Sequence, residues 1–248
     1  MSNSPLVTYT KLSPNHSGRR NHVIDTVSIH CMAGNASVET CGALFADPSR
    51  KASSNYGIGS DGRIALYVEE ANRSWCTSNA ANDHRAITIE VANNGGAPDW
   101  PVSDKAYAAL LDLLTDICRR NGIKKLLWKG DKSLIGQVDK QNMTVHRWFA
   151  NKSCPGDYLY NLHDEIAAEV NRRLSGGTSG GGGGTTTPST GNATTGGAGA
   201  TVEPYLVRVT ISDLYIRKGP GTNYGKNGFI APGVYTIVAE STGTGATK

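Results

Sequence analysis

Two short stretches of this sequence carry side chains that bind metal ions. His146 and Cys154 lie eight positions apart, and a Pro-Gly turn follows the cysteine directly. A third ligand stands far upstream, where His30 ends the short apolar run Thr-Val-Ser-Ile-His. Two neutral imidazoles and one thiolate are ligands that zinc takes in enzymes, with a fourth position left for water. The residue types therefore predict a catalytic zinc site, with a closed structural zinc site as the alternative.

Two further residues have types suited to work beside such a metal. Zinc lowers the pKa of bound water to about 7 and polarises a carbonyl oxygen. Glu90 lies in the apolar run Ile-Thr-Ile-Glu-Val, where an unpaired carboxylate is costly to bury. It can move protons as a general base and acid, although a solvated sheet edge would also explain it. Lys152, two residues before Cys154, can stabilise a developing oxyanion. Together the five groups predict amide hydrolysis.

Two predicted strands must position His30 and Glu90. In a strand, successive side chains point to opposite faces. Residues 23–30 therefore place Ser28 and His30 on a polar face, opposite their apolar neighbours. Residues 86–92 alternate in the same way and place Glu90 on the polar face of a second strand. Both groups are expected to project from a sheet on the same kind of face.

Three helices and one hairpin are predicted around these strands. Apolar residues recur at helical spacing, and Ser37, Ser103 and Asp157 are suited to cap the first turns. Asp-Gly supplies the positive backbone angles of a tight hairpin. The first twenty or so residues are polar and are expected to drape over the surface. The predicted helices span residues 37–46, 103–121 and 157–174, and the hairpin turns at residues 60–62.

The remaining cysteines and histidines receive plainer interpretations. A thiol just before a helix and beside a lysine has its thiolate favoured, which suits Cys154 for zinc. Cys31 should point away from whatever His30 faces, so it is not assigned to the metal. Three other histidines are interpreted as solvated: His16, His22 and His163.

Composition limits the kinds of partner. The 248 residues carry a mild net charge of +4 with scattered basic residues, which indicates no nucleic-acid partner. No apolar run is long enough for membrane insertion, and the start has no signal-peptide core. We expect a monomer that is made in the cytoplasm and acts after something else releases it. Five cysteines, an odd number, favour a reduced compartment or a metal site over a disulfide scaffold.

Residues 175–201 predict a boundary between two domains. They consist only of Gly, Ser, Thr, Ala, Asn and Pro, a composition typical of a flexible linker. The linker separates a catalytic domain, residues 1–174, from a small all-β pattern in residues 202–248. The latter is near the lower size limit for a domain that folds without staples.

Four blocks of this sequence resemble, in order and spacing, one known family. The blocks are Ser-Ile-His-Cys-Met-Ala-Gly at residues 28–34, Ser-Asn-Tyr-Gly-Ile-Gly-Ser-Asp-Gly at 54–62, Ile-Thr-Ile-Glu-Val-Ala-Asn at 87–93, and residues 146–156. They resemble the type 2 N-acetylmuramoyl-L-alanine amidases of phage endolysins and bacterial autolysins, relatives of the peptidoglycan recognition proteins. The resemblance spans roughly residues 6–174. Many relatives carry histidine where this chain has Asn55.

The resemblance implies a fold and a reaction. It implies an α/β domain in which helices flank a mixed central sheet, with zinc held by His30, His146 and Cys154. It also implies that Glu90 and Lys152 assist hydrolysis of the amide between N-acetylmuramic acid and L-alanine in bacterial peptidoglycan, which causes wall lysis. The alternative is a non-catalytic peptidoglycan-binding protein of the same fold. Relatives of that kind usually lack the thiolate ligand.

Two further expectations concern substrate and wall binding. We expect substrate contacts from Tyr56, Trp75 and His84, although the last two are as readily interpreted as ordinary loop residues. The C-terminal stretch is similar to a bacterial Src-homology-3 (SH3)-like wall-binding domain, on the motifs Leu-Tyr-Ile-Arg-Lys-Gly-Pro-Gly and Gly-Phe-Ile-Ala-Pro-Gly. A closing strand with tryptophan and glycine is missing, which predicts a truncated module.

Overall fold

The computed structural model describes residues 2–176, 200–209, 215–217, 224–230 and 233–240. The chain divides into two compact units, Met1–Gly180 and Gly181–Lys248, and each is described by itself. Most of the predicted linker lies outside the described residues.

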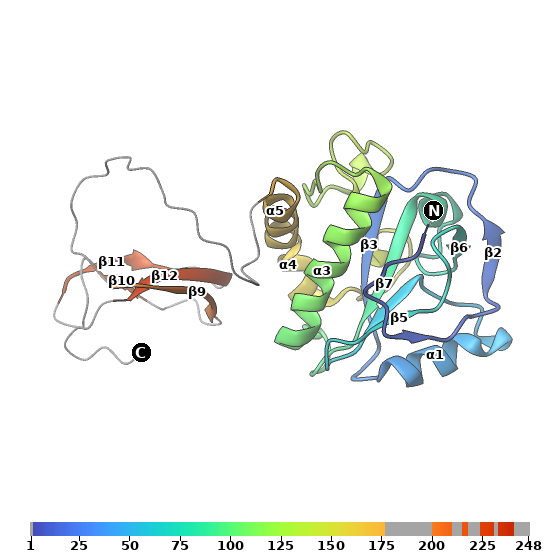
Figure 1. The fold of residues 1–248 in the computed structure, drawn as a ribbon, viewed down its shortest axis with the longest axis horizontal. Helices are drawn as coiled ribbons and strands as arrows, with labels where there is room; N and C mark the ends of the chain where they lie inside the picture. The colour runs from blue at the N-terminus through green and yellow to red at the C-terminus, as the bar shows by residue number, and fades with distance from the viewer. Residues whose placement is uncertain (1, 177–199, 210–214, 218–223, 231–232, 241–248) are drawn as a thin grey trace. The chain divides into compact units, whose positions relative to one another are not determined.

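A six-stranded mixed sheet organises the first unit (Figure 1). Its strand order is β1-β5-β4-β7-β3-β8, in which only the β4–β5 pair is antiparallel. The central strands β3 and β7 run parallel, so residues of equal register project together from one face. The strands are β1 (Tyr9–Thr10), β3 (Thr26–Cys31), β4 (Tyr56–Ile58), β5 (Ile64–Leu66), β7 (Ala86–Val91) and β8 (Met143–Thr144).

Helices flank this sheet. Two long helices, α3 (Asp104–Asn121) and α5 (His163–Leu174), lie beside each other against one face, and the shorter α1 (Val38–Ala46) lies near the β1 edge (Figure 1). The remaining helices are α2 (Ala80–Arg85) and α4 (Gly156–Asn161), with 3-10 turns η1 (Pro48–Arg50), η2 (Lys132–Leu134) and η3 (His146–Trp148). The expected α/β architecture, a mixed central sheet with flanking helices, is confirmed.

The apolar faces explain this arrangement. In α3 a stripe that includes Leu110, Leu114 and Ile117 is fully buried against the sheet residues Ile29 and Ile89. Ser103 accepts a hydrogen bond from the amide of the third helical residue, and Gly122 ends α3 with a left-handed backbone. This stripe packs α3 against one face of the sheet. The opposite face of β3 and β7 is left for polar groups.

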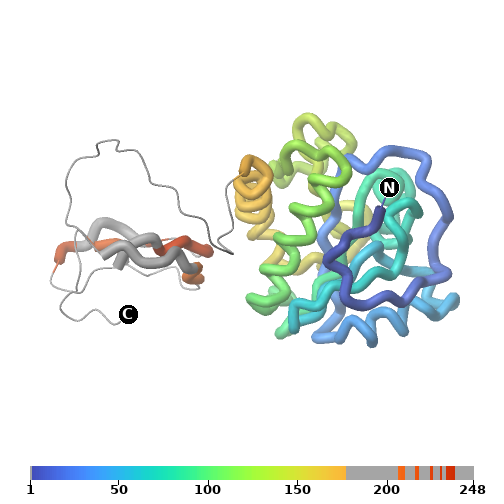
Figure 2. The backbone as a smooth tube through the Cα atoms, viewed as in Figure 1, coloured from blue at the N-terminus to red at the C-terminus, as the bar shows by residue number. Residues whose placement is uncertain are grey.

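The N-terminal segment adds strands instead of only draping over the surface. β1 extends the sheet beside β5, and β2 (His16–Arg19) pairs with β6 (Asn72–Ser74) as a separate ribbon. Figure 2 shows this segment, in dark blue, running along one side of the unit. Short polar strands of this kind carry too little alternation to be read from sequence. Their pairing anchors the segment that follows β6, which carries Trp75.

Two further expectations near the last helix are wrong. The helix predicted from Asp157 is interrupted at Leu162, and α4 has no side-chain N-cap hydrogen bond. His163 is fully buried, not solvated, because its ring packs against Trp128 at 4.3 Å between centroids. Its Nδ1 lies 2.7 Å from the carbonyl oxygen of Leu159. Burial lowers the pKa of His163 to about 4.

The described parts of the second unit are all β. β9 (Ala200–Val209) pairs antiparallel with β12 (Gly233–Glu240), and β10 (Tyr215–Arg217) pairs antiparallel with β11 (Lys226–Phe229). The Gly-Pro-Gly motif of residues 219–221 lies outside the described residues. The similarity of this unit to an SH3-like module therefore stays a prediction. The prediction that the module is truncated stays one as well. Among the described helices none is long and apolar enough to cross a membrane.

Candidate metal centre

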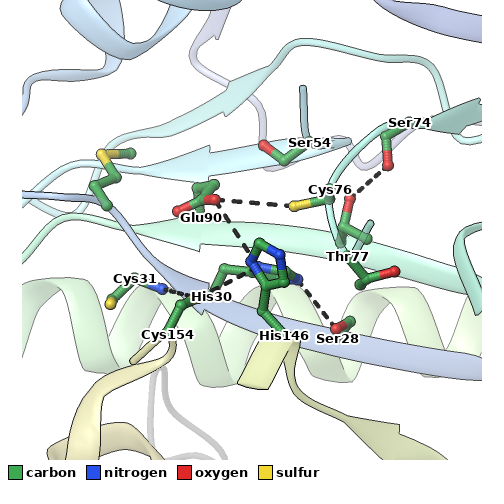
Figure 3. A network of polar contacts seen from close by, with 12 residues as sticks. Ser28, His30, Cys31, Ser54, Ser74, Cys76, Thr77, Glu90, His146 and Cys154 are labelled. Carbon is green, nitrogen blue, oxygen red and sulfur yellow. Dashed lines mark hydrogen bonds and ion pairs between the residues drawn. The ribbon is translucent and has the colours of Figure 1, made fainter. Parts of the chain in front are cut away.

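The sheet contributes His30 and Glu90 to one polar cluster. His30 on β3 and Glu90 on β7 are register partners, so both project from the same face, as the alternation predicts. Their closest atoms, His30 Nδ1 and Glu90 Oε1, are 3.9 Å apart. The other ring nitrogen of His30, Nε2, lies 3.1 Å from the Ser28 hydroxyl (Figure 3). The imidazole is thus held between a serine and the cluster.

Two loops bring His146 and Cys154 to the same cluster. Cys154 Sγ lies 3.4 Å from His30 Nδ1 and accepts a hydrogen bond from the Cys31 amide, also at 3.4 Å. The rings of His30 and His146 are 5.2 Å apart between centroids. One ligand atom from each of His30, His146 and Cys154 lies within 4.8 Å of the other two. The three predicted ligands therefore converge, although 124 residues separate the first from the last.

Both histidines are kept neutral. Burial, and then the neighbouring His146, lower the pKa of His30 well below its usual range. Burial and the Lys152 ammonium lower the pKa of His146. A neutral imidazole offers the lone pair that a metal ion requires. The surroundings of both rings therefore favour metal binding over protonation.

Cys154 differs from the prediction in one respect. Its pKa is raised well above the usual value by hydrogen bonding with Cys31 and by burial, with a further increase from Glu90. The expected lowering is not seen because Lys152 is exposed and α4 is only six residues long. In this electrostatic setting a bound cation is needed to favour the thiolate.

Glu90 is mostly buried and incompletely paired. Its side chain is 15% exposed, and Oε1 accepts a long contact from the Cys76 thiol at 3.9 Å. Burial, and then the Cys31 sulfur, raise its pKa to about 8. Within the described residues, Oε2 has no hydrogen-bond partner. A buried carboxylate oxygen without a partner is costly in a purely structural role and suits a group that contacts water or substrate.

A second metal-binding set overlaps the first. His30, Cys76 and Glu90 also place one ligand atom each within 4.8 Å of one another. Cys76 was not singled out from the sequence as a ligand. Its thiol lies beside Glu90, and burial is the largest cause that raises its pKa well above the usual value. Both sets depend on His30.

The segment that faces the sheet is held by Asp83. This buried carboxylate accepts hydrogen bonds from the amides of Cys76 and Thr77 and, at 2.6 Å, from the Thr77 hydroxyl. The next residue, Ser78, places its hydroxyl 3.2 Å from His146 Nε2. Sequence reasoning missed both Asp83 and Ser78. Only their position in a polar stretch near Trp75 could have drawn attention to them.

Two hollows of different character adjoin the cluster. One, of about 460 Å³, has the cationic lining residues Lys51, Arg73 and Lys152. The other, of about 270 Å³, is largely apolar and includes Met32 and Phe45. Trp75, Cys76 and His146 line both hollows. The metal centre therefore opens onto a cleft with one cationic and one apolar side.

The predicted substrate contacts fare differently. Trp75 lines both hollows and is held by a 2.7 Å hydrogen bond from its indole nitrogen to Ser17. Tyr56 is fully buried, and its hydroxyl donates to Glu70 at 2.6 Å, so it cannot contact substrate. His84 lines neither hollow, and its Nδ1 accepts from the Asn21 amide. Burial contradicts substrate contact at Tyr56, whereas contact at His84 stays a prediction.

Asn55 has a structural role. Its side chain is fully buried, accepts from Arg20 at 2.9 Å and donates to the carbonyl oxygen of Val68 at 3.1 Å. It also accepts from the Thr88 amide at 3.2 Å. Asn55 therefore ties β4 to β7.

Residues 20–157 match the family described as N-acetylmuramoyl-L-alanine amidase, which is more than half of the chain. This chain belongs to that amidase family. The match includes all three converging ligands and Glu90. A comparison with curated proteins finds no match.

Three solved structures are similar to this chain. The hydrolase AmiA of Staphylococcus aureus, in complex with its ligand, is 14% identical, covers 69% of this chain and 86% of its own, and has a TM-score of 0.50. The endolysin amidase LysCS of Clostridium intestinale is 13% identical, with 66% and 97% covered and a TM-score of 0.45. The Drosophila peptidoglycan recognition protein SA is 19% identical, with 63% and 90% covered and a TM-score of 0.45. At this identity the AmiA comparison supports the fold alone.

Proposed function

We propose that this amidase-family chain uses zinc to hydrolyse the amide bond between N-acetylmuramic acid and L-alanine in bacterial peptidoglycan. The observation that carries the proposal is the convergence of His30, His146 and Cys154 next to Glu90, where two hollows meet. Family membership supports the substrate class. Cell-wall lysis would follow from loss of this cross-linking attachment.

The donor set fits zinc. Two imidazole nitrogens and one sulfur are ligands that tetrahedral zinc accepts, and three protein ligands leave one position open. The neutral state of both histidines agrees with this role. When bound, zinc supplies an acidified water and polarises the scissile carbonyl. The open position distinguishes this set from a closed structural site.

Glu90 is placed to move the protons of the reaction. Its carboxylate lies on the same sheet face as His30 and has one oxygen without a partner among the described residues. In its ionised form it accepts a proton from the attacking water, and its raised pKa favours the later delivery of a proton to the leaving amine. Because hydrolysis of an amide needs both transfers, one carboxylate serves as base and then as acid.

Lys152 is placed to stabilise developing negative charge. It lines the cationic hollow together with His146, and its ammonium is close enough to lower the pKa of that histidine. A cation at this point favours the oxyanion over the neutral carbonyl. Because Lys152 is exposed, solvent weakens this contribution relative to that of Glu90.

The cleft suits a substrate with chemically different ends. Peptidoglycan joins a sugar chain to a stem peptide that bears carboxylates. The side lined by Lys51 and Arg73 favours anionic groups, whereas the side lined by Met32 and Phe45 favours apolar ones. A scissile amide bond bound near His146 would lie between the cationic side and the apolar side of the cleft.

The test is release of new N-terminal alanine from purified sacculi, with reducing sugar ends measured in parallel. Zinc-loaded protein should release alanine amines without new reducing ends, and chelator-treated protein and Cys154→Ser should release none. A non-catalytic binding protein of the same fold would bind sacculi in all three samples and release nothing. Alanine release that persists in Cys154→Ser would contradict the proposed ligand set.

A further inference from the structure

The two ring nitrogens of His30 have different surroundings. Nδ1 faces the cluster, 3.4 Å from Cys154 Sγ and 3.9 Å from Glu90 Oε1. Nε2 faces the other way, 3.1 Å from the hydroxyl oxygen of Ser28 (Figure 3). His30 and Ser28 are both fully buried, so bulk water does not substitute for either partner. Which nitrogen carries the proton therefore depends on Ser28.

The hydroxyl of Ser28 has a second partner that bears on the direction of its hydrogen bond to His30. Its oxygen lies 3.2 Å from the carbonyl oxygen of Thr144, the register partner of Ser28 on β8. A carbonyl oxygen only accepts, and a serine hydroxyl has one hydrogen to donate. A hydrogen donated to Thr144 leaves Ser28 only a lone pair to offer to His30. In that arrangement the proton of the neutral imidazole lies on Nε2.

We propose that Ser28 is a positioning residue that fixes the tautomer of His30. The relay from His30 through Ser28 to the Thr144 carbonyl keeps the Nδ1 lone pair directed into the cluster before a metal ion arrives. Hydrogen bonds of this kind orient metal-binding histidines and raise their affinity. The metal identity rests on the proposed function, but the tautomer does not. Because His30 already holds the tautomer that a metal ion requires, metal binding does not have to include a change of tautomer.

His146 provides the contrast. Its Nε2 also lies near a serine hydroxyl, 3.2 Å from Ser78. Ser78 is exposed and belongs to a loop, where its backbone φ is +63°. Water can replace an exposed hydroxyl at little cost. The two serines are therefore a matched pair. The buried Ser28 hydroxyl has no substitute, whereas water can take the place of the exposed Ser78 hydroxyl.

The relay also limits the number of ions. Cys154 and Glu90 both approach the same atom, His30 Nδ1, so the two overlapping ligand sets compete for one lone pair. With Nε2 protonated, His30 cannot bridge two ions. One zinc ion per chain is the expected stoichiometry at this cluster.

The experiment compares zinc affinity in wild type, Ser28→Ala and Ser78→Ala, by competition with a chromophoric chelator. Ser28→Ala should bind zinc about 10–100 times more weakly, whereas Ser78→Ala should change affinity less than about threefold. Ser28→Thr, which keeps the hydroxyl, should recover most of the lost affinity. Equal affinity in wild type and Ser28→Ala would overturn the proposal.

A second readout reports the tautomer directly. In the metal-free wild type, nitrogen NMR of labelled histidine should show a protonated Nε2 and an unprotonated Nδ1 at His30. Ser28→Ala should show a mixture. A proton on Nδ1 in the wild type would overturn the relay even if Ser28→Ala fails to fold. A wild type that binds zinc and shows this tautomer but releases no alanine would contradict the proposed function and leave the relay intact.

Discussion

The cleft has two walls of different construction. The sheet wall, His30 and Glu90, is fixed by the parallel register of β3 and β7, and its ligand is completely buried. The loop wall, residues 75–79 with His146–Cys154, is partly exposed and held by individual side-chain hydrogen bonds. A strand ladder fixes many atoms at once, whereas a loop depends on a few contacts. We therefore expect changes in the sheet wall to remove chemistry and changes in the loop wall to alter stability or binding.

The largest effect is expected at the sheet wall. Glu90→Gln keeps the shape of the side chain but cannot accept a proton, so kcat should fall by about 10²–10⁴-fold. Zinc affinity should change little because Glu90 is outside the proposed ligand set. Alanine release and bound zinc, measured on the same sample, check both statements. A variant with normal kcat would show that the proton carrier lies elsewhere.

Acid should lower the stability of the aromatic cluster that packs next to the loop wall. Trp148, two residues after His146, stacks on Trp128, which packs on His163. Burial lowers the pKa of His163 from 6.5 to about 4. Between these two pH values the histidine is protonated in the unfolded chain and neutral in the folded chain. Stability should therefore fall from pH 6.5 to 4, by roughly 3 kcal/mol from this residue.

Urea unfolding at several pH values tests this effect. His163→Gln should lose less stability over the window from pH 6.5 to 4 than the wild type does. If the His163 and wild-type curves run parallel, the burial of this histidine has no bearing on acid stability.

A direct disruption of the loop wall comes from Asp83→Ala. The change leaves the buried amides of Cys76 and Thr77 without an acceptor, at a cost of roughly 2–3 kcal/mol in unfolding free energy. Asp112→Ala, at a carboxylate that is 60% exposed, should cost less than about 1 kcal/mol. Equal losses in the two variants would mean that Asp83 does not organise the loop.

The smallest effect is expected on substrate binding. Trp75 lines both hollows, and Trp75→Ala should raise KM for soluble peptidoglycan fragments roughly tenfold, about 1.4 kcal/mol. kcat should stay within about threefold because no proposed catalytic group is touched. Tyr56→Phe is the matched aromatic control. It should leave KM unchanged and cost about 1 kcal/mol of stability through its lost hydrogen bond to Glu70.

The placement of the side chains in the sheet wall could be predicted from the sequence, and that in the loop wall only in part. Strict alternation around His30 and Glu90 determines which face each side chain takes, and parallel pairing then brings them together. The contacts of Ser78 with His146, and of Asp83 with Cys76 and Thr77, depend on the conformation of residues 75–79, which has no periodic signal. Their roles therefore required the structure.

Two errors have specific physical reasons. The alternation of β4 does not reveal that Tyr56 is covered by Glu70 and by the amide of Ser4, because both contacts come from distant segments. For His163 a signal existed. It follows Leu159 by four positions and precedes Ile166 by three, which places it on the buried helical face. The position of His163 on that face, and not its polarity, determines its burial.

X-ray absorption spectroscopy of the zinc-loaded chain tests the central claim most directly. The account predicts one sulfur at about 2.3 Å, two imidazole nitrogens at about 2.0–2.1 Å and one exchangeable oxygen. The same sample should contain one zinc ion per chain. A first shell without sulfur would remove Cys154 from the site. A shell of four protein ligands with no exchangeable oxygen would identify a structural zinc and contradict the proposed hydrolysis.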